Sequence, residues 1–137
     1  MNLERTSKNQ IAMAKAAVKS ILKNKSALKV NGKLWIETKG EKFFGPGPVE
    51  LLEKIEATGS LNKAAKEMKM SYKKAWKIVK TLNATGAKPF VVMQSGGEEG
   101  GGSSITEEAK KMISYHSAMR KRFEAFLLKE TTLLKKS

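Results

Sequence analysis

The sequence predicts a mainly helical α+β domain that carries a small amount of β-hairpin structure. Several segments repeat apolar residues at spacings of three and four, which is typical of amphipathic helices. Two short stretches have β-type composition, and Gly- and Pro-rich breaks separate them from the helices. The 137 residues, 40% of them hydrophobic, suffice for one domain with a hydrophobic core.

The N-terminal region predicts a helix over Gln10–Lys23. Its apolar stripe consists of Ile11, Ala14, Val18 and Ile21. The helix is basic, but it has no Trp, Phe or Tyr to anchor it in a lipid surface, so we expect it to pack against protein. Residues 1–27 are therefore expected to be a packing or dimerisation segment.

The segment Leu28–Phe44 changes to a β-type pattern. Leu34, Trp35 and Ile36 predict a strand, and Lys39–Lys42 predicts a turn, so a hairpin is expected. The sequence Gly-Pro-Gly-Pro at 45–48 then ends extended structure, and either proline suits the first turn of a helix. That helix should bury Val49, Leu52 and Ile55 and end at Gly59.

Two closely linked helices follow. Ser60 is a good N-cap for a helix over Leu61–Met68, and Ser71 is an N-cap for a second helix that reaches about Asn83. The apolar faces are expected to be Leu61, Ala64, Ala65 and Met68 in the first helix, and Ala75, Trp76, Val79 and Leu82 in the second. Small alanines allow the helices to cross closely, which is the pattern of a helix-turn-helix.

The last third predicts a strand over Phe90–Gln94, a glycine-rich loop over Ser95–Ser104, and a long helix over Thr106–Glu130. Along that helix, a seam with a period of 3.5 residues predicts a homodimer contact through Ala109, Met112, His116, Met119, Phe123 and Phe126. The alternative is that the two phenylalanines fold back onto their own subunit. We therefore expect a binding domain at 28–105 and a dimerisation helix with its tail at 106–137.

The charge is the most informative total. Twenty-seven Lys and Arg residues against 13 Asp and Glu give a net charge of +14, which favours a polyanionic partner such as DNA, RNA or an anionic membrane. No apolar run is long enough to span a bilayer, and the N-terminus does not resemble a secretory signal. The absence of Cys is consistent with a reducing compartment, so a cytoplasmic protein without membrane contact is expected.

The lysines gather on the second helix of the pair. If its apolar face packs inward, Lys73, Lys74 and Lys77 project outward, and Glu67 is the only acid between Ser60 and Lys80. In a helix-turn-helix the N-terminal end of the second helix meets base edges, whereas the first helix contacts the backbone. Contacts to double-stranded DNA are therefore expected from Ser60, Lys63, Lys66, Ser71, Tyr72, Lys73, Lys74 and Lys77. An amphipathic helix with a merely solvated lysine face is the alternative.

These motifs carry a family resemblance. The segments Gly59–Lys66, Met70–Trp76 and Leu82–Asn83, with the glycine run and Ile105–Thr106, resemble the N-terminal DNA-binding domain of the ModE family of molybdate-responsive bacterial regulators. The segments Leu34–Glu37 and Phe44–Gly47 fit as well. The resemblance covers about Leu28 to Tyr115, and a more distant similarity is to the LysR-type helix-turn-helix.

The resemblance implies a winged helix-turn-helix that dimerises and represses or activates transcription. It implies a wing built on Gly96, Gly97, Gly100, Gly101 and Gly102. Glu98 and Glu99 in that loop would repel phosphates, so a plain connector is the alternative. The family also has a C-terminal oxyanion-binding domain, for which the seven residues after Glu130 are too few. We therefore expect neither molybdate nor another cofactor.

Other function classes find little support. His116 is the single histidine, so a His-based metal site and a Ser-His triad are not expected, and an enzyme is not expected either. A hydrogen-bonded interface residue is the default role for His116, and a pH-sensitive dimer contact is the alternative. The serious alternatives to a specific regulator are a non-specific nucleic-acid-binding or architectural protein, and an interaction-only dimer that also pairs with a full-length homologue.

Overall fold

The computed structural model describes residues 8–10, 20–94 and 102–136, and the chain divides into two compact units. The larger unit spans Leu34–Arg120, and the smaller one combines Met1–Lys33 with Lys121–Ser137. The helix expected over Gln10–Lys23 falls mostly outside the described residues. Residues 10, 20 and 21 are helical, whereas residues 22 and 23 are not, so this helix ends before the expected Lys23.

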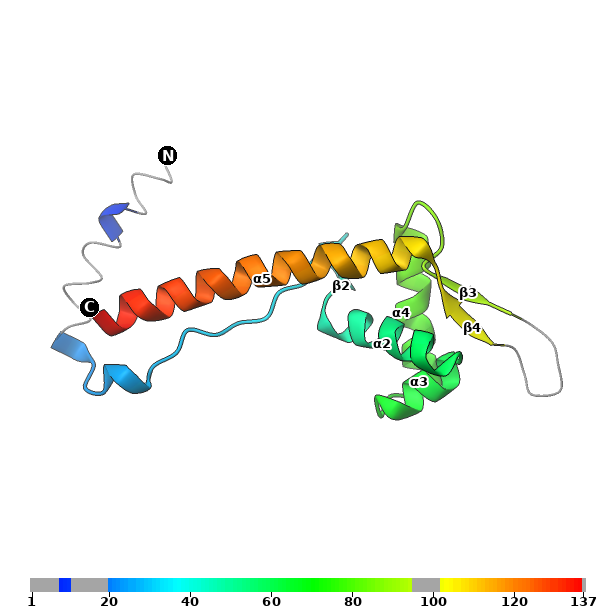
Figure 1. The fold of residues 1–137 in the computed structure, drawn as a ribbon, viewed down its shortest axis with the longest axis horizontal. Helices are drawn as coiled ribbons and strands as arrows, with labels where there is room; N and C mark the ends of the chain where they lie inside the picture. Colours follow the sequence, from blue (N-terminus) through cyan, green and yellow to red (C-terminus); the bar gives the residue numbers. More distant parts are fainter. Residues whose placement is uncertain (1–7, 11–19, 95–101, 137) are drawn as a thin grey trace. The chain divides into compact units, whose positions relative to one another are not determined.

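The larger unit is mainly helical and contains two separate antiparallel hairpins. Its elements in chain order are β1 (Ile36–Thr38), β2 (Glu41–Phe44), α2 (Pro46–Thr58), α3 (Leu61–Glu67), α4 (Tyr72–Thr85), β3 (Val91–Met93), β4 (Ser103–Ile105) and the first half of α5 (Glu107–Lys136) (Figure 1). The α+β class predicted from the sequence is confirmed at this level, including the long C-terminal helix.

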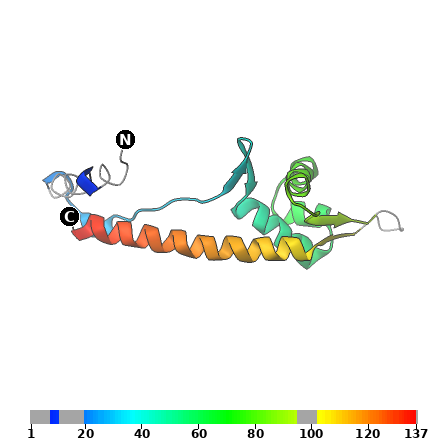
Figure 2. The ribbon, with the colours of Figure 1, turned by 90° about the horizontal axis from the view of Figure 1, so that it is seen from above.

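The β1–β2 hairpin turns through two residues with left-handed backbone. Lys39 and Gly40 have φ angles of 51° and 79°, which match the twist of a tight hairpin. Thr38 pairs with Glu41 across this turn, so the observed turn is two residues shorter than the turn expected at Lys39–Lys42. Leu34 and Trp35 precede the strand instead of belonging to it. Figure 2 shows the hairpin leading directly into α2.

Helix α2 forms the centre of the core. It starts at Pro46, where a missing backbone N–H costs nothing, and it ends at Gly59, whose φ of 70° suits a residue without a side chain. Leu51, Leu52 and Ile55 are completely buried. The expected start and end of this helix are therefore confirmed.

Helices α3 and α4 are joined by a tight link. Lys69 adopts a left-handed φ of 55°, and the Met70 N–H donates to the Ala65 carbonyl at 3.0 Å. Ala64, Ala65 and Ala75 are fully buried, so small side chains allow the two helices to approach closely.

The core of this unit is one cluster. It consists of Phe43, Phe44, Leu51, Leu52, Ile55, Leu61, Ala64, Ala65, Ala75, Val79, Leu82, Phe90, Val91 and Ala109. Trp76 is not part of it. Its side chain is 39% exposed, so the prediction that it belongs to the inner face of α4 was wrong.

The start of α5 closes the core from another side. Ala109 and His116 are buried, and Met112 packs against the core cluster. The ring of His116 lies edge-on to Phe44 with 5.5 Å between centroids. Met112 and His116, which were expected in a dimer seam, thus occupy positions inside their own chain.

The smaller unit contains η1 (Lys25–Ala27) and the C-terminal half of α5. The Val30 N–H donates to Thr131 Oγ1 at 2.8 Å, and the rings of Phe123 and Phe126 stack with centroids 6.4 Å apart. Phe126 is 54% exposed, whereas Phe123 is partly covered and lies close to Gly32. Helix α5 continues past the expected end at Glu130 to Lys136.

Candidate nucleic-acid interface

The core fixes which face of α4 meets solvent. Ala75, Val79 and Leu82 are completely buried and define the inner side of the helix. At about 100° per residue, the opposite side carries Lys73, Lys77 and Lys80, and all three are exposed. Lys74 projects from one flank of this face.

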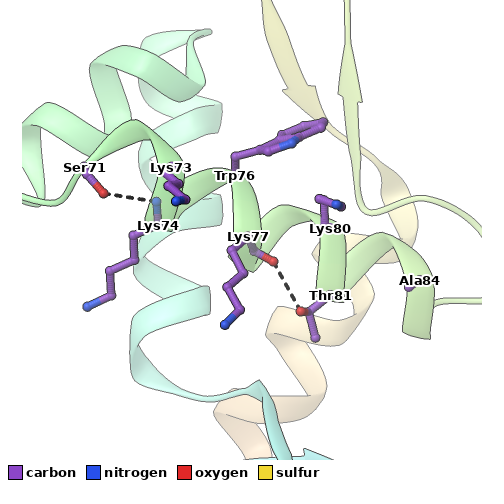
Figure 3. A pocket seen from close by; sticks show the side chains of 8 residues that line it. All are labelled: Ser71, Lys73, Lys74, Trp76, Lys77, Lys80, Thr81 and Ala84. Carbon is purple, nitrogen blue, oxygen red and sulfur yellow. Dashed lines mark hydrogen bonds between the residues drawn. The ribbon is translucent and has the colours of Figure 1, made fainter.

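These side chains surround an open depression of about 730 Å³ along the outer side of α4 (Figure 3). Its lining residues are Ser71, Lys73, Lys74, Trp76, Lys77, Lys80, Thr81 and Ala84. The surface thus combines four ammonium groups with one large aromatic ring. It spans the helix from its N-cap to its last turn.

Few acidic side chains accompany the lysines of this surface. The segment from Ser60 to Lys80 contains seven lysines, Lys80 included, and its one acid, Glu67, is near Lys54 of α2 at 3.9 Å. Within the described ranges, no lysine of α3 or α4 forms an ion pair. A helix that only needs a solvated face usually mixes both signs, so this arrangement favours an anionic partner.

The N-terminal end of α4 is fixed by a side-chain cap. Ser71 Oγ accepts a hydrogen bond from the Lys74 N–H at 3.1 Å. Since a hydroxyl also carries one donor, Ser71 keeps a proton for an outside acceptor. Tyr72, the first residue of the helix, is 49% exposed. The two N-caps predicted from the sequence are confirmed, because Ser60 Oγ accepts from the Lys63 N–H at 3.1 Å in the same way.

Helix α3 presents a second, smaller set of cations. Lys63 and Lys66 are exposed on this helix, which packs against α4. Ser60 is half-buried at the start of α3, and neither it nor the two lysines line the depression on α4.

A groove adjoins the lysine face on its other flank. It has a volume of about 510 Å³ and runs between α4, β2 and the start of α2. Its lining residues are Glu41, Lys42, Phe43, Gly47, Pro48, Met70, Lys74, Lys77, Ile78 and Thr81. Lys74, Lys77 and Thr81 belong to both hollows, so the cationic surface is continuous from the outer face of α4 to its β2 side.

The β3–β4 hairpin is attached to α4 by one side chain. Asn83 Oδ1 accepts from the N–H groups of Phe90 and Val91 at 2.8 and 3.0 Å, and Asn83 Nδ2 donates to the Val91 carbonyl at 3.0 Å. A second attachment joins β4 to the α2–α3 junction, where the Ser103 N–H donates to the Gly59 carbonyl at 2.8 Å. The hairpin therefore has a fixed position beside α4.

The tip of this hairpin lies outside the described residues. Gly96, Gly97, Gly100 and Gly101 fall there, together with the two glutamates at 98 and 99. Gly102 is described, and its carbonyl accepts from the Gln94 N–H at 2.8 Å, which closes the base of the loop.

Comparison with known proteins gives a consistent relationship. The chain is 37% identical over 79 residues to the molybdenum transport protein ModE of Azotobacter vinelandii, which is 58% of this chain and 29% of that protein. It is 33% identical over 77 residues to the transcriptional regulator ModE of Haemophilus influenzae, covering 56% and 30% of the two chains. The chain is related to the ModE family. No protein-family model matches the sequence.

The match to ModE is partial on both sides. Molybdenum-pterin-binding protein MopB of Rhodobacter capsulatus is 38% identical over 76 residues, again with 56% of this chain and 28% of the relative. The chain thus spans less than a third of the length of these relatives. The relationship supports the family resemblance found in the sequence. Because most of each relative lies outside the matched segment, the ligands of the whole ModE proteins are not assigned to this chain.

The sequence did not predict the positions of three residues in or beside the lysine-rich surface of α4. Lys80 lines the same depression as Lys73 and Lys77, and its spacing of seven and three residues from them could have indicated this. Trp76 was assigned to the core. No sequence pattern predicted the hydrogen bonds of Asn83, which was named only as a helix end and in the family resemblance. Its partners, Phe90 and Val91, lie beyond the turn that follows α4.

The described part of the chain offers neither a metal-binding cluster nor a membrane-spanning helix. No group of three or more His, Cys, Asp or Glu side chains there could hold a metal ion. No helix in the same ranges combines the length and apolarity that crossing a membrane requires.

Proposed function

We propose that this chain is a sequence-specific DNA-binding transcriptional regulator of the winged helix-turn-helix type, which reads the major groove with α4. The observation that carries the proposal is the outer face of α4, where cations without acidic partners line one side of a helix held by a buried opposite side. The relationship to a protein named a transcriptional regulator supports it.

The proposal assigns two roles to the lysines. Ser71, Tyr72, Lys73 and Lys74 at the start of α4 contact base edges, where a lysine can donate to guanine O6 or N7. Lys63 and Lys66 of α3, with Ser60 at its N-cap, contact the phosphate backbone, which sets the register but carries no sequence information. Lys77, one turn further along α4, extends the contact within the groove.

The hairpin β3–β4 takes the place of a wing in this proposal. Its attachment to α4 through Asn83 fixes it beside the helix. In this proposal the attachment holds the base of the wing, Val91–Met93 and Ser103–Ile105, beside the recognition helix.

A homodimer completes the proposal. Exposed Phe126 and its neighbour Phe123 on α5 offer apolar surface for a second copy, with Met119 one turn before them. Two copies would place their recognition helices about 34 Å apart on a near-palindromic site. Sedimentation of the full chain over a range of concentrations tests this, and a monomer at all concentrations would contradict it.

Selection of bound duplexes from a random DNA library tests the specific-regulator proposal. We expect enrichment of one sequence with two half-sites, bound roughly 10³-fold or more tightly than random DNA. A Lys73→Ala, Lys74→Ala double variant should lose this enrichment. A Lys111→Ala, Lys121→Ala variant removes the same charge from exposed positions on α5 and should keep it. If no sequence is enriched, or if both variants behave alike, the proposal fails. Binding to random DNA would then indicate a non-specific polyanion binder, and no DNA binding at low salt would indicate an interaction-only dimer.

A further inference from the structure

The chain has two tryptophans of similar exposure, and their surroundings differ. Trp35 is 43% exposed, but its indole N–H donates to Glu37 Oε1 at 3.0 Å and the Lys42 ammonium lies 5.1 Å from its ring centroid. Trp76 is 39% exposed. Among the described residues, its N–H has no acceptor and its ring has no cationic or aromatic partner. Trp35 therefore has partners for both its indole N–H and its ring, whereas Trp76 has neither among the described residues.

Trp76 lies at the edge of the surface that carries the positive charge. It follows Lys73 by three residues and precedes Lys80 by four, which are spacings that bring side chains together on a helix. All three line the depression on α4, and Figure 3 shows the indole standing out from the helix beside the lysines.

The major groove of DNA offers both kinds of partner at once. Phosphates and guanine edges satisfy the lysines, and the thymine C5-methyl is the apolar group that a base pair presents in this groove. Contact with a methyl group adds no binding energy for a lysine ammonium, whereas a flat aromatic ring buries apolar surface against it.

Resting on the proposed function of α4, we propose that Trp76 is a specificity-determining residue that packs its indole against a thymine C5-methyl group in the major groove. Removal of water from one methyl group corresponds to about a fourfold change in affinity. The DNA site is therefore expected to require thymine at one position of each half-site.

Deoxyuridine substitution tests this contact, because it removes the methyl group and leaves base pairing intact. The full chain and its selected duplex are used, and each thymine is replaced in turn. For the unaltered protein we expect one position per half-site at which uracil weakens binding about fourfold. For Trp76→Ala the same replacement should have no effect, and the thymine duplex itself should bind at least fourfold more weakly.

Two further variants secure the interpretation. Trp76→Phe keeps an apolar ring and should retain part of the uracil effect. Tyr115→Ala removes a 56% exposed aromatic ring from α5 and should leave the whole uracil profile unchanged. Circular dichroism and melting of each variant show whether it folds, and the exposure of Trp76 predicts that Trp76→Ala does.

Three results would overturn the inference while the proposed function stands. The first is that no thymine responds to uracil in the unaltered protein. The second is that Trp76→Ala weakens all duplexes equally and keeps the uracil effect, which would indicate an indole N–H contact to phosphate. The third is that Trp76→Ala binds DNA normally, which would indicate a protein partner for this ring. If no sequence is selected at all, the proposed function fails and the inference fails with it.

Discussion

Asn83 offers the sharpest test of how the fold positions the recognition surface. Its amide makes three hydrogen bonds to the backbone of Phe90 and Val91, at 2.8, 3.0 and 3.0 Å, and these bonds join α4 to the β3–β4 hairpin. Replacement by Ala removes all three while the helix loses nothing, because Ala has the higher helix propensity. The variant therefore isolates the attachment of the hairpin.

The expected cost follows from these three bonds. Each net hydrogen bond contributes about 0.5–1.5 kcal/mol, and leaving partly buried backbone groups without partners adds to the loss. Higher helix propensity and entry of water offset part of it, so we expect Asn83→Ala to lower the free energy of unfolding by about 2–3 kcal/mol. For a domain of the size of the larger unit, Leu34–Arg120, this loss corresponds to a decrease in Tm of roughly 10–20 °C.

Urea denaturation followed by circular dichroism, at one fixed protein concentration, measures this difference. Thr81→Ala is the matched control on the same helix, because its hydroxyl only returns to the Lys77 carbonyl at 3.2 Å. We expect the control to change stability by less than about 0.5 kcal/mol. If Asn83→Ala also costs less than this, water replaces the amide fully and the hairpin is not held by Asn83.

The remaining predictions concern the DNA contact, the buried histidine and one close packing contact. Lys73→Ala should change the preferred base at one position by about 1–3 kcal/mol in competition binding, whereas Lys63→Ala should weaken all sequences alike and reduce the salt slope by about one. Burial, and secondarily the charge of Arg120, lower the pKa of His116 below its ordinary value of 6.5. The unfolded state therefore binds more protons as the pH falls below about 6.5, so stability in urea titrations should decrease from pH 7.5 to 5.5, and His116→Leu should remove this part of the dependence. Gly86→Ala would place Cβ 2.8 Å from the Phe90 ring and closer still to a backbone carbonyl. It should lower stability by about 1–3 kcal/mol in thermal melts.

The helices around the recognition surface could be predicted because their ends depend on local chemistry. Ser60 and Ser71 cap helices through their own hydroxyls, and Gly59 permits the left-handed backbone that ends α2. Such signals need no knowledge of distant residues. The starts and ends of α2, α3 and α4 therefore agree with the prediction to within two residues.

Trp76 shows where a pattern of apolar residues stops being sufficient. It is adjacent in sequence to the buried Ala75, and it lies about 100° around the helix from it. Side-chain type alone placed it inside, but three residues, Ala75, Val79 and Leu82, already fill the inner side of α4. Whether a flanking position is covered depends on which neighbour packs there, and that is settled by tertiary structure.

The expected seam along α5 has the same limitation for another reason. An apolar stripe on a helix has the same period whether it faces its own core or a second chain. Met112 and His116 meet the core, and Phe44, the ring partner of His116, comes from a distant hairpin. Phe126, ten residues after His116 on the same helix, is exposed. The sequence cannot mark the point along the stripe at which core contact ends.

The buried side of α4 fixes the backbone that carries the lysines on its exposed side. Four long lysines are mobile by themselves, and ordering them on DNA costs about 0.5–1.5 kcal/mol for each side chain. The backbone that carries them needs no further ordering, because Ala75, Val79 and Leu82 are completely buried and Asn83 secures the far end of the helix. A loss of packing at Ala75 should therefore weaken specific binding more than non-specific binding, since base edges require fixed positions and phosphates only require charge.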